Sequence, residues 1–141
     1  MSLDSIFGVA GTALNAQMTR MNATASNLAN AGTVSTTEAG AFRAKRPVFK
    51  ALVDEAMTHG GAPYVGGVKV DQIIDDKAPV RRISDPTNPL ADAQGYVYQS
   101  NVSEVTEMVE MMAAGRSYQN NVEVINTARQ LMMRTLEITR T

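Results

Sequence analysis

Residues that interrupt helices are confined to the middle of the chain, and this distribution constrains the fold more than any other feature. All five prolines lie between residues 47 and 89, and seven of the ten glycines lie between residues 32 and 95. Proline removes a backbone donor and glycine weakens a helix, so only the two ends can form long helices. The pattern divides the chain into three expected segments, residues 1–33, 34–100 and 101–141.

The first segment predicts one long helix. From Leu3 to Leu28, alternating steps of four and three residues meet an apolar residue at six of eight positions. This 3.5-residue spacing is typical of helices that pack along their length. Gly32 lies just beyond the last of these positions, and we expect it to terminate the helix.

The last segment predicts a second helix. Steps of three and four residues from Met108 to Leu136 meet apolar residues at seven of nine positions. Ser103 is a candidate N-cap, and Glu104 and Glu107 place acids in the first turn, where the helix dipole favours them.

The middle segment reads as short strands and turns. Val68, Val70, Gln72 and Ile74 alternate with other residues, as expected for a half-buried strand, and residues 80–83 and 95–98 are two further candidate strands. The predicted class is therefore α+β, in which two long terminal helices pack as a coiled-coil-like pair and a small β-rich domain lies between them.

Two unequal helices cannot enclose a good core, so each should keep an open apolar face. Composition supports this view, because the 141 residues hold no Trp and three Phe but nine Met. Methionine suits surfaces that pack against partners, whereas aromatic residues usually dominate compact cores. We therefore expect self-association, and repeated contacts between different surfaces produce rings or open helical filaments.

Charge and residue usage argue against several other functions. Thirteen basic and fourteen acidic residues give a net charge of −1 without a basic arm, so no nucleic-acid partner is expected. The chain has no Cys and one His, which leaves little to hold a metal. No apolar run approaches the length of a membrane span, and the N-terminus does not read as a cleavable signal peptide.

Three groups resemble active-site chemistry but have simpler interpretations. His59 stands in a turn with no acid–nucleophile partners nearby. Asp75-Asp76 ends a predicted strand beside Lys77, and we interpret this pair as a solvated turn rather than an acid–base pair. The cluster Arg43–Arg46 could contact phosphates, but an exposed interface or an ion-paired strand is favoured. No catalytic, metal-binding or cofactor-binding residue is predicted.

Both ends of the chain resemble the flagellar rod, hook and filament axial proteins. The residues that carry the resemblance are Ala13-Leu14-Asn15-Ala16-Gln17 and Met21–Asn30 at the N-terminus, with Glu107-Met108-Val109 and Arg116–Val124 at the C-terminus. The length, Arg46-Pro47-Val48-Phe49, and Asp85-Pro86 leading to Gly95-Tyr96-Val97 are similar to the proximal rod members of this family. Gly115 departs from the pattern, because a serine is usual there.

The resemblance implies a structural, non-enzymatic role without a cofactor or small-molecule substrate. Such proteins build the helical rod of the bacterial basal body, which spans the periplasm and transmits motor torque to the hook. Implied partners are copies of the chain, other proximal and distal rod proteins, the hook–basal-body adaptor protein and the flagellar export apparatus, which exports the subunit without a cleaved signal. The terminal helices are expected to be poorly ordered before assembly.

Two other interpretations remain. One is a type III secretion needle-like subunit or an export-associated adaptor, which usually lacks a β-rich insert. The other is a small enzyme, which would need a pocket with convergent polar groups.

The apolar stripes and the asparagines of the N-terminal motif together define an expected assembly seam. Its members are Leu14, Met21, Asn27, Leu28, Asn30, Met108, Met111, Gly115, Tyr118, Val122, Ile125, Met132 and Leu136. At Gly115 either the position is merely tolerant, or the missing side chain lets another helix, such as the Ala-rich N-terminal one, approach closely.

Overall fold

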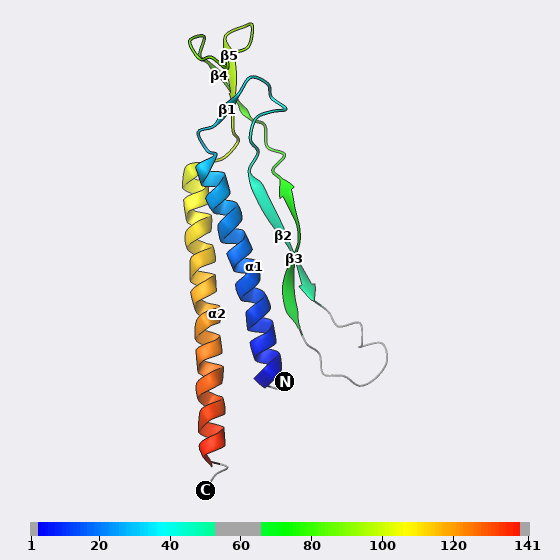
Figure 1. Cartoon of the computed structure of the whole chain (residues 1–141), viewed down its shortest axis with the longest axis vertical. Helices are drawn as coiled ribbons and strands as arrows, with labels where there is room; N and C mark the ends of the chain where they lie inside the picture. Colours follow the sequence, from blue (N-terminus) through cyan, green and yellow to red (C-terminus); the bar gives the residue numbers. More distant parts are fainter. Residues whose placement is uncertain (1–2, 53–65, 139–141) are drawn as a thin grey trace, which may run out of the picture. The chain divides into compact units, whose positions relative to one another are not determined.

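The computed structural model describes residues 3–52 and 66–138, and its described part is α+β as predicted (Figure 1). The elements are α1 (Leu3–Ala29), β1 (Val34–Ser35), β2 (Lys45–Leu52), β3 (Gly67–Asp75), β4 (Arg81–Ser84), β5 (Tyr96–Gln99) and α2 (Glu104–Ile138). His59 lies outside the described residues.

The chain forms two compact units, and both helices contribute to each. Unit 1 takes its described residues from Met1–Thr19, Val48–Gln72 and Ala113–Thr141. Unit 2 consists of Arg20–Pro47 and Ile73–Met112.

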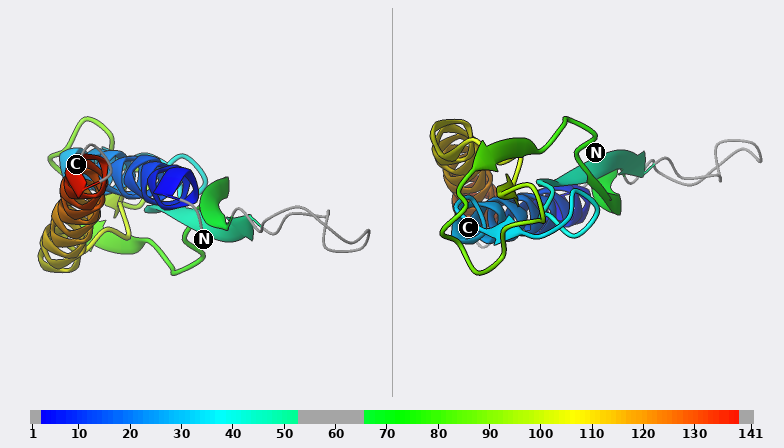
Figure 2. Two further views of the ribbon diagram at one scale, coloured as in Figure 1. Left: turned by 90° about the horizontal axis from the view of Figure 1, so that it is seen from below. Right: turned by 90° about the horizontal axis from the view of Figure 1, so that it is seen from above.

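In unit 1, α1 and α2 run side by side in opposite directions (Figure 1). Both end-on views place α1 of this unit between α2 and the paired strands β2 and β3 (Figure 2). The Thr12 hydroxyl on α1 accepts a hydrogen bond from the backbone N–H of Val68 at 3.2 Å. A Cβ added at Gly67 would lie 2.8 Å from the Thr12 hydroxyl oxygen, so the absence of a side chain permits this close approach of β3 to α1.

Unit 2 contains an antiparallel sheet in the order β1–β5–β4. The β4–β5 connection closes where the N–H of Asp85 donates to the carbonyl of Gly95 at 3.0 Å. Gly95 has a φ of +79°, and an added Cβ would lie 3.2 Å from the Pro86 ring, so glycine is favoured on both grounds. Ala31, Ala44 and Val102 of this unit form a small buried cluster.

The predicted strands at residues 68–74, 80–83 and 95–98 correspond to β3, β4 and β5. The alternating burial predicted for β3 is only partly right, because Val68 and Val70 are half-buried whereas Gln72 and Ile74 are exposed. The sequence pattern did not predict β1, and it pointed to β2 only through the ion-paired alternative for Arg43–Arg46.

The two helix boundaries differ in how well the sequence predicted them. α2 begins directly after Ser103, as expected, and the Ser103 carbonyl accepts the N–H of Glu107 at 2.9 Å. The terminating role predicted for Gly32 is wrong, because α1 ends at Ala29 and Gly95 alone among the described glycines has a positive φ. Side chains close this end instead: the Asn30 amide donates to the Ser26 carbonyl and the Thr33 hydroxyl donates to the Asn30 carbonyl, both at 2.8 Å.

Candidate assembly surface and the helix–strand junction

The seam positions on α1 and at its end divide by chemistry. Leu14, Met21 and Leu28 are half-buried apolar side chains. Asn27 is completely buried, and Asn30 is half-buried at the closing turn described above. The N-terminal part of the seam therefore combines apolar surface with hydrogen bonding that holds the end of α1.

The seam positions on α2 fall into two rows. Met111, Tyr118, Ile125 and Met132 are half-buried, whereas Met108, Val122 and Leu136 are exposed. The positions buried most deeply are Glu107, Ala114 and Ala128. The first two stand one residue before the predicted seam positions Met108 and Gly115. Two of these three positions hold alanine and the third holds Glu107, so the larger apolar residues that defined the pattern lie at the edges of this face or outward.

Gly115 is not a point of close approach within the described chain. Apart from the nearby backbone of α2 itself, a Cβ built at this position would meet nothing within 4 Å, so α1 does not press against it. The close intrachain approach considered from the sequence is therefore wrong. The fully buried small residue of this turn is Ala114.

In unit 2, remote parts of the chain meet at a site that we call the junction. It is formed by the side chains of Asn27, Arg46, Asn101 and Glu107 and by the backbone of Ala44 and Lys45. Asn27 uses its whole amide here: its oxygen accepts the N–H of Lys45 at 2.7 Å, and its nitrogen donates to the Lys45 carbonyl at 3.0 Å and to Glu107 Oε2 at 2.9 Å. α1 is thereby joined to both β2 and α2.

Asn101 makes a parallel arrangement from the residues that lead into α2. Its side-chain oxygen accepts the N–H of Ala44 at 2.8 Å, and its nitrogen donates to the carbonyl of Ala78 at 2.8 Å. Two asparagines from opposite ends of the sequence therefore bind the adjacent N–H groups of Ala44 and Lys45. Ala44 is completely buried, so these bonds satisfy backbone groups that water does not reach.

Glu107 is the charged centre of the junction. Its side chain is completely buried, with Oε1 2.6 Å from Arg46 Nη1 in an ion pair, although Oε1 has no hydrogen bond of good geometry. Arg46 is also 3.5 Å from Asp76, and a separate ion pair joins Arg20 on α1 to Glu110 on α2. A buried carboxylate needs such partners, because an unpaired charge out of water is strongly unfavourable.

The structure decides between the alternatives for two charged groups. Lys45 and Arg46, at the start of β2, form ion pairs with Asp75 and Asp76, which confirms the ion-paired strand. Arg43, which precedes the strand, pairs with Glu38. Asp75 ends β3, as expected, but the carboxylates of Asp75 and Asp76 are paired with basic side chains as well as partly solvated. They are the acidic side of this strand pairing.

Sequence reasoning missed the burial of Glu107, its pairing with Arg46 and the role of Asn101. It placed Glu107 in the first turn for its effect on the helix dipole, but the side chain faces inward. Glu107 lies four residues before Met111, so a step of four toward the N-terminus from this half-buried position would have found it.

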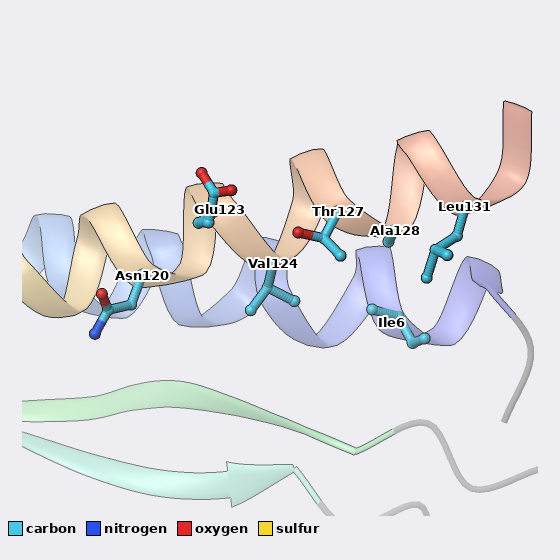
Figure 3. A pocket seen from close by; sticks show the side chains of 7 residues that line it. All are labelled: Ile6, Asn120, Glu123, Val124, Thr127, Ala128 and Leu131. Carbon is cyan, nitrogen blue, oxygen red and sulfur yellow. The ribbon is translucent and has the colours of Figure 1, made fainter. Parts of the chain in front are cut away.

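Unit 1 carries an open apolar groove of about 370 Å³ between its two helices. In Figure 3, Ile6 of α1 lies opposite Val124, Ala128 and Leu131 of α2. Glu123 supplies the one ionisable side chain of the lining. The groove thus offers apolar packing rather than a set of convergent catalytic groups.

Within residues 3–52 and 66–138, no group of three or more His, Cys, Asp or Glu side chains could hold a metal ion. No helix in this part of the chain has the length and apolarity that a membrane span requires.

Known proteins match both the helical ends and the whole chain. Residues 7–34 match the family described as "Flagella basal body rod protein", and residues 93–138 match "Flagellar basal body rod FlgEFG protein C-terminal". The flagellar basal-body rod protein FlgC of Yersinia enterocolitica is 49% identical over 138 residues, and that of Salmonella typhimurium is 48% identical over 138 residues. Each comparison covers 98% of both chains. The chain belongs to the FlgC family of flagellar basal-body rod proteins.

More distant FlgC proteins also match nearly the full length. The FlgC protein of Bacillus subtilis is 33% identical over 141 residues, covering 92% of this chain and 93% of the relative. The matched family regions include most of α1 and all of α2, the elements that carry the expected seam. The resemblance to rod proteins is confirmed, and the chain is a structural rod subunit of the flagellar basal body.

Proposed function

We propose that the chain polymerises with copies of itself and other rod proteins into the proximal rod, the helical drive shaft that transmits torque from motor to hook. In this proposal residues 1–33 and 101–141 form the axial part of each subunit, and residues 34–100 form a separate middle domain. The role is non-enzymatic and requires no nucleic acid, cofactor or small-molecule substrate.

The observation that carries this proposal is the large apolar surface of α2. Ten of its large hydrophobic side chains are at least 36% exposed: Val105, Met108, Val109, Met112, Val122, Val124, Leu131, Met133, Leu136 and Ile138. Exposed apolar side chains in this number on one helix are usually covered by neighbours. Contacts between copies in a helical assembly would cover this surface repeatedly.

The same proposal includes coiled-coil-like packing of the terminal helices. Its support is the spacing of enclosed positions on α2, which alternates between four and three residues through Glu107, Met111, Ala114, Tyr118, Asn121, Ile125, Ala128 and Met132. This is the repeat that lets one helix face another along its length.

Export and placement follow from the same role. We propose that the flagellar export apparatus delivers the subunit without a cleaved signal peptide, and that the rod it enters spans the periplasm. The hook–basal-body adaptor protein and the distal rod proteins would be partners further along the same axis.

Electron microscopy of purified basal bodies tests the proposal. We expect the chain to be traceable in the proximal rod, with the apolar face of α2 covered by adjacent subunits. Basal bodies from a strain that lacks the chain are the control and should lack that part of the rod. Tracing the chain in a needle-like filament or at the export apparatus, and not in the rod, would instead favour a secretion needle subunit or an export-associated adaptor.

A further inference from the structure

The apolar residues buried on the two helices give little to define one alignment. The buried apolar residues of α1 are Ala10, Ala16 and Ala23, and those of α2 are Ala114 and Ala128. Alanine presents a similar small surface at each position, and the half-buried residues one repeat apart on α2 are all largely apolar, namely Met111, Tyr118, Ile125 and Met132. Sliding one helix along the other by one repeat would therefore exchange one apolar contact for another, and a polar contact would specify the register more sharply than apolar packing.

After such a slip, no residue could take over the contacts that Glu107 makes. A displacement by seven residues moves it about 10 Å along the helix. The residue entering its place would be Ala114 or Ser100, neither of which carries a charge for Arg46. The carboxylate would then lose Asn27 and Arg46 together, and a buried charge without partners disfavours that alignment strongly.

Asn27 ties this alignment to the strand as well as to α2. Its amide bonds both backbone groups of Lys45, so Glu107 meets an amide that is already fixed in orientation. Arg46, the next residue of β2, brings the positive charge to the same carboxylate. Both partners of Glu107 therefore depend on two adjacent residues of β2: Lys45 binds Asn27, and Arg46 binds Glu107 itself.

We propose that Glu107, bound by Asn27 and Arg46, sets the register and rotation of α2 against α1 in unit 2. Because Glu107 points inward, Val105, Met108, Val109 and Met112 are turned outward, and their side chains are 52–73% exposed. The junction would thus decide which apolar residues of α2 are offered to a neighbouring subunit. This last step rests on the proposed assembly into a rod, whereas the setting of the register does not.

Cysteine cross-linking of the purified full-length chain tests the register directly, because the natural sequence has no cysteine. Arg20→Cys with Glu110→Cys reports the observed alignment, since these residues form an ion pair across the helices. Arg20→Cys with Ser117→Cys reports an alignment shifted by seven residues. A short thiol-reactive cross-linker and mass spectrometry give the ratio of the two linked products, compared at equal protein concentration.

With Glu107 intact, we expect the 20–110 product and very little of the 20–117 product. Glu107→Gln keeps the shape but loses the charge, and we expect it to lower the ratio by about tenfold. Glu107→Leu with Arg46→Met removes the buried pair while filling the space, so we expect it to keep the helical content while also lowering the ratio. Asp76→Asn is the matched control, because it removes the other carboxylate partner of Arg46 and should leave the ratio unchanged.

The ratio separates a change of register from loss of folding. A slip transfers yield from one pair to the other, whereas unfolding lowers both yields together with the helical circular dichroism signal. Equal yields of the two pairs with Glu107 intact, an unchanged ratio in both variants, or a parallel loss of both products would each overturn the proposal. Because the chain is measured without a rod, these results stand whether or not the subunit is found in the basal body.

Discussion

Substitutions of Gly115 separate the stability of one chain from its packing in the rod. A Cβ at this position meets no other atom within 4 Å in the described chain, so alanine brings no clash. Glycine within a helix is less favourable than alanine by about 1 kcal/mol. We therefore expect Gly115→Ala to stabilise the isolated subunit by about this amount, a roughly fivefold change in its unfolding equilibrium.

Gly115→Leu gives the sharper test. Leucine has nearly the helix propensity of alanine, so the isolated Leu variant should also be more stable than the natural chain. In the rod, however, a neighbouring helix that approaches this position would meet a bulky side chain, at a cost of about 1–3 kcal/mol in every subunit. We expect the Ala and Ser variants to support swimming and the Leu variant to fail in rod assembly.

Two measurements check this reasoning. Urea unfolding followed by circular dichroism should place the midpoint of the Ala variant about 0.5 M above that of the natural chain. Swimming assays and electron microscopy of basal bodies report assembly, with Gln119→Leu at an exposed position of α2 as the control. Normal rods built from the Leu variant would show that no neighbour approaches Gly115, and a destabilised Ala variant would refute the structural argument itself.

Three further predictions concern other parts of the chain. Ile125→Asp should abolish flagella while the subunit is still synthesised, because a charge on the seam costs several kcal/mol; normal swimming would contradict a packed seam there. The side-chain oxygen of Gln17 is buried without a hydrogen-bond partner, so Gln17→Met should raise the free energy of unfolding by about 1 kcal/mol, and a lower urea midpoint would contradict this. The Thr87 hydroxyl and the Asn88 amide hold the pKa of Asp85 below its ordinary value of 3.8. Their stabilisation of the turn is therefore present above that value and is lost as pH falls through the lowered pKa, and an NMR titration midpoint for Asp85 at or above 3.8 would refute it.

The sequence by itself determined the features that depend on local spacing. Breaker-free ends and a 3.5-residue apolar repeat predict α1 and α2 because helices bring residues three and four apart onto one face. The placement of Ser103 before α2 follows from the same local chemistry. Strands β3, β4 and β5 were also found, since alternation and flanking turn residues act over a few positions.

Tertiary structure alone decided which face of each helix turns inward and what holds it there. Periodicity treats Met108 and Glu107 by their polarity, so it placed the methionine on the seam and left the glutamate as a first-turn acid that the helix dipole favours. In the fold Glu107 can be buried because Asn27 and Arg46 both contact its carboxylate. These partners lie 80 and 61 residues away in the sequence. A local pattern cannot contain that information, because the free energy of burying a charge is set by partners that only the folded chain brings together.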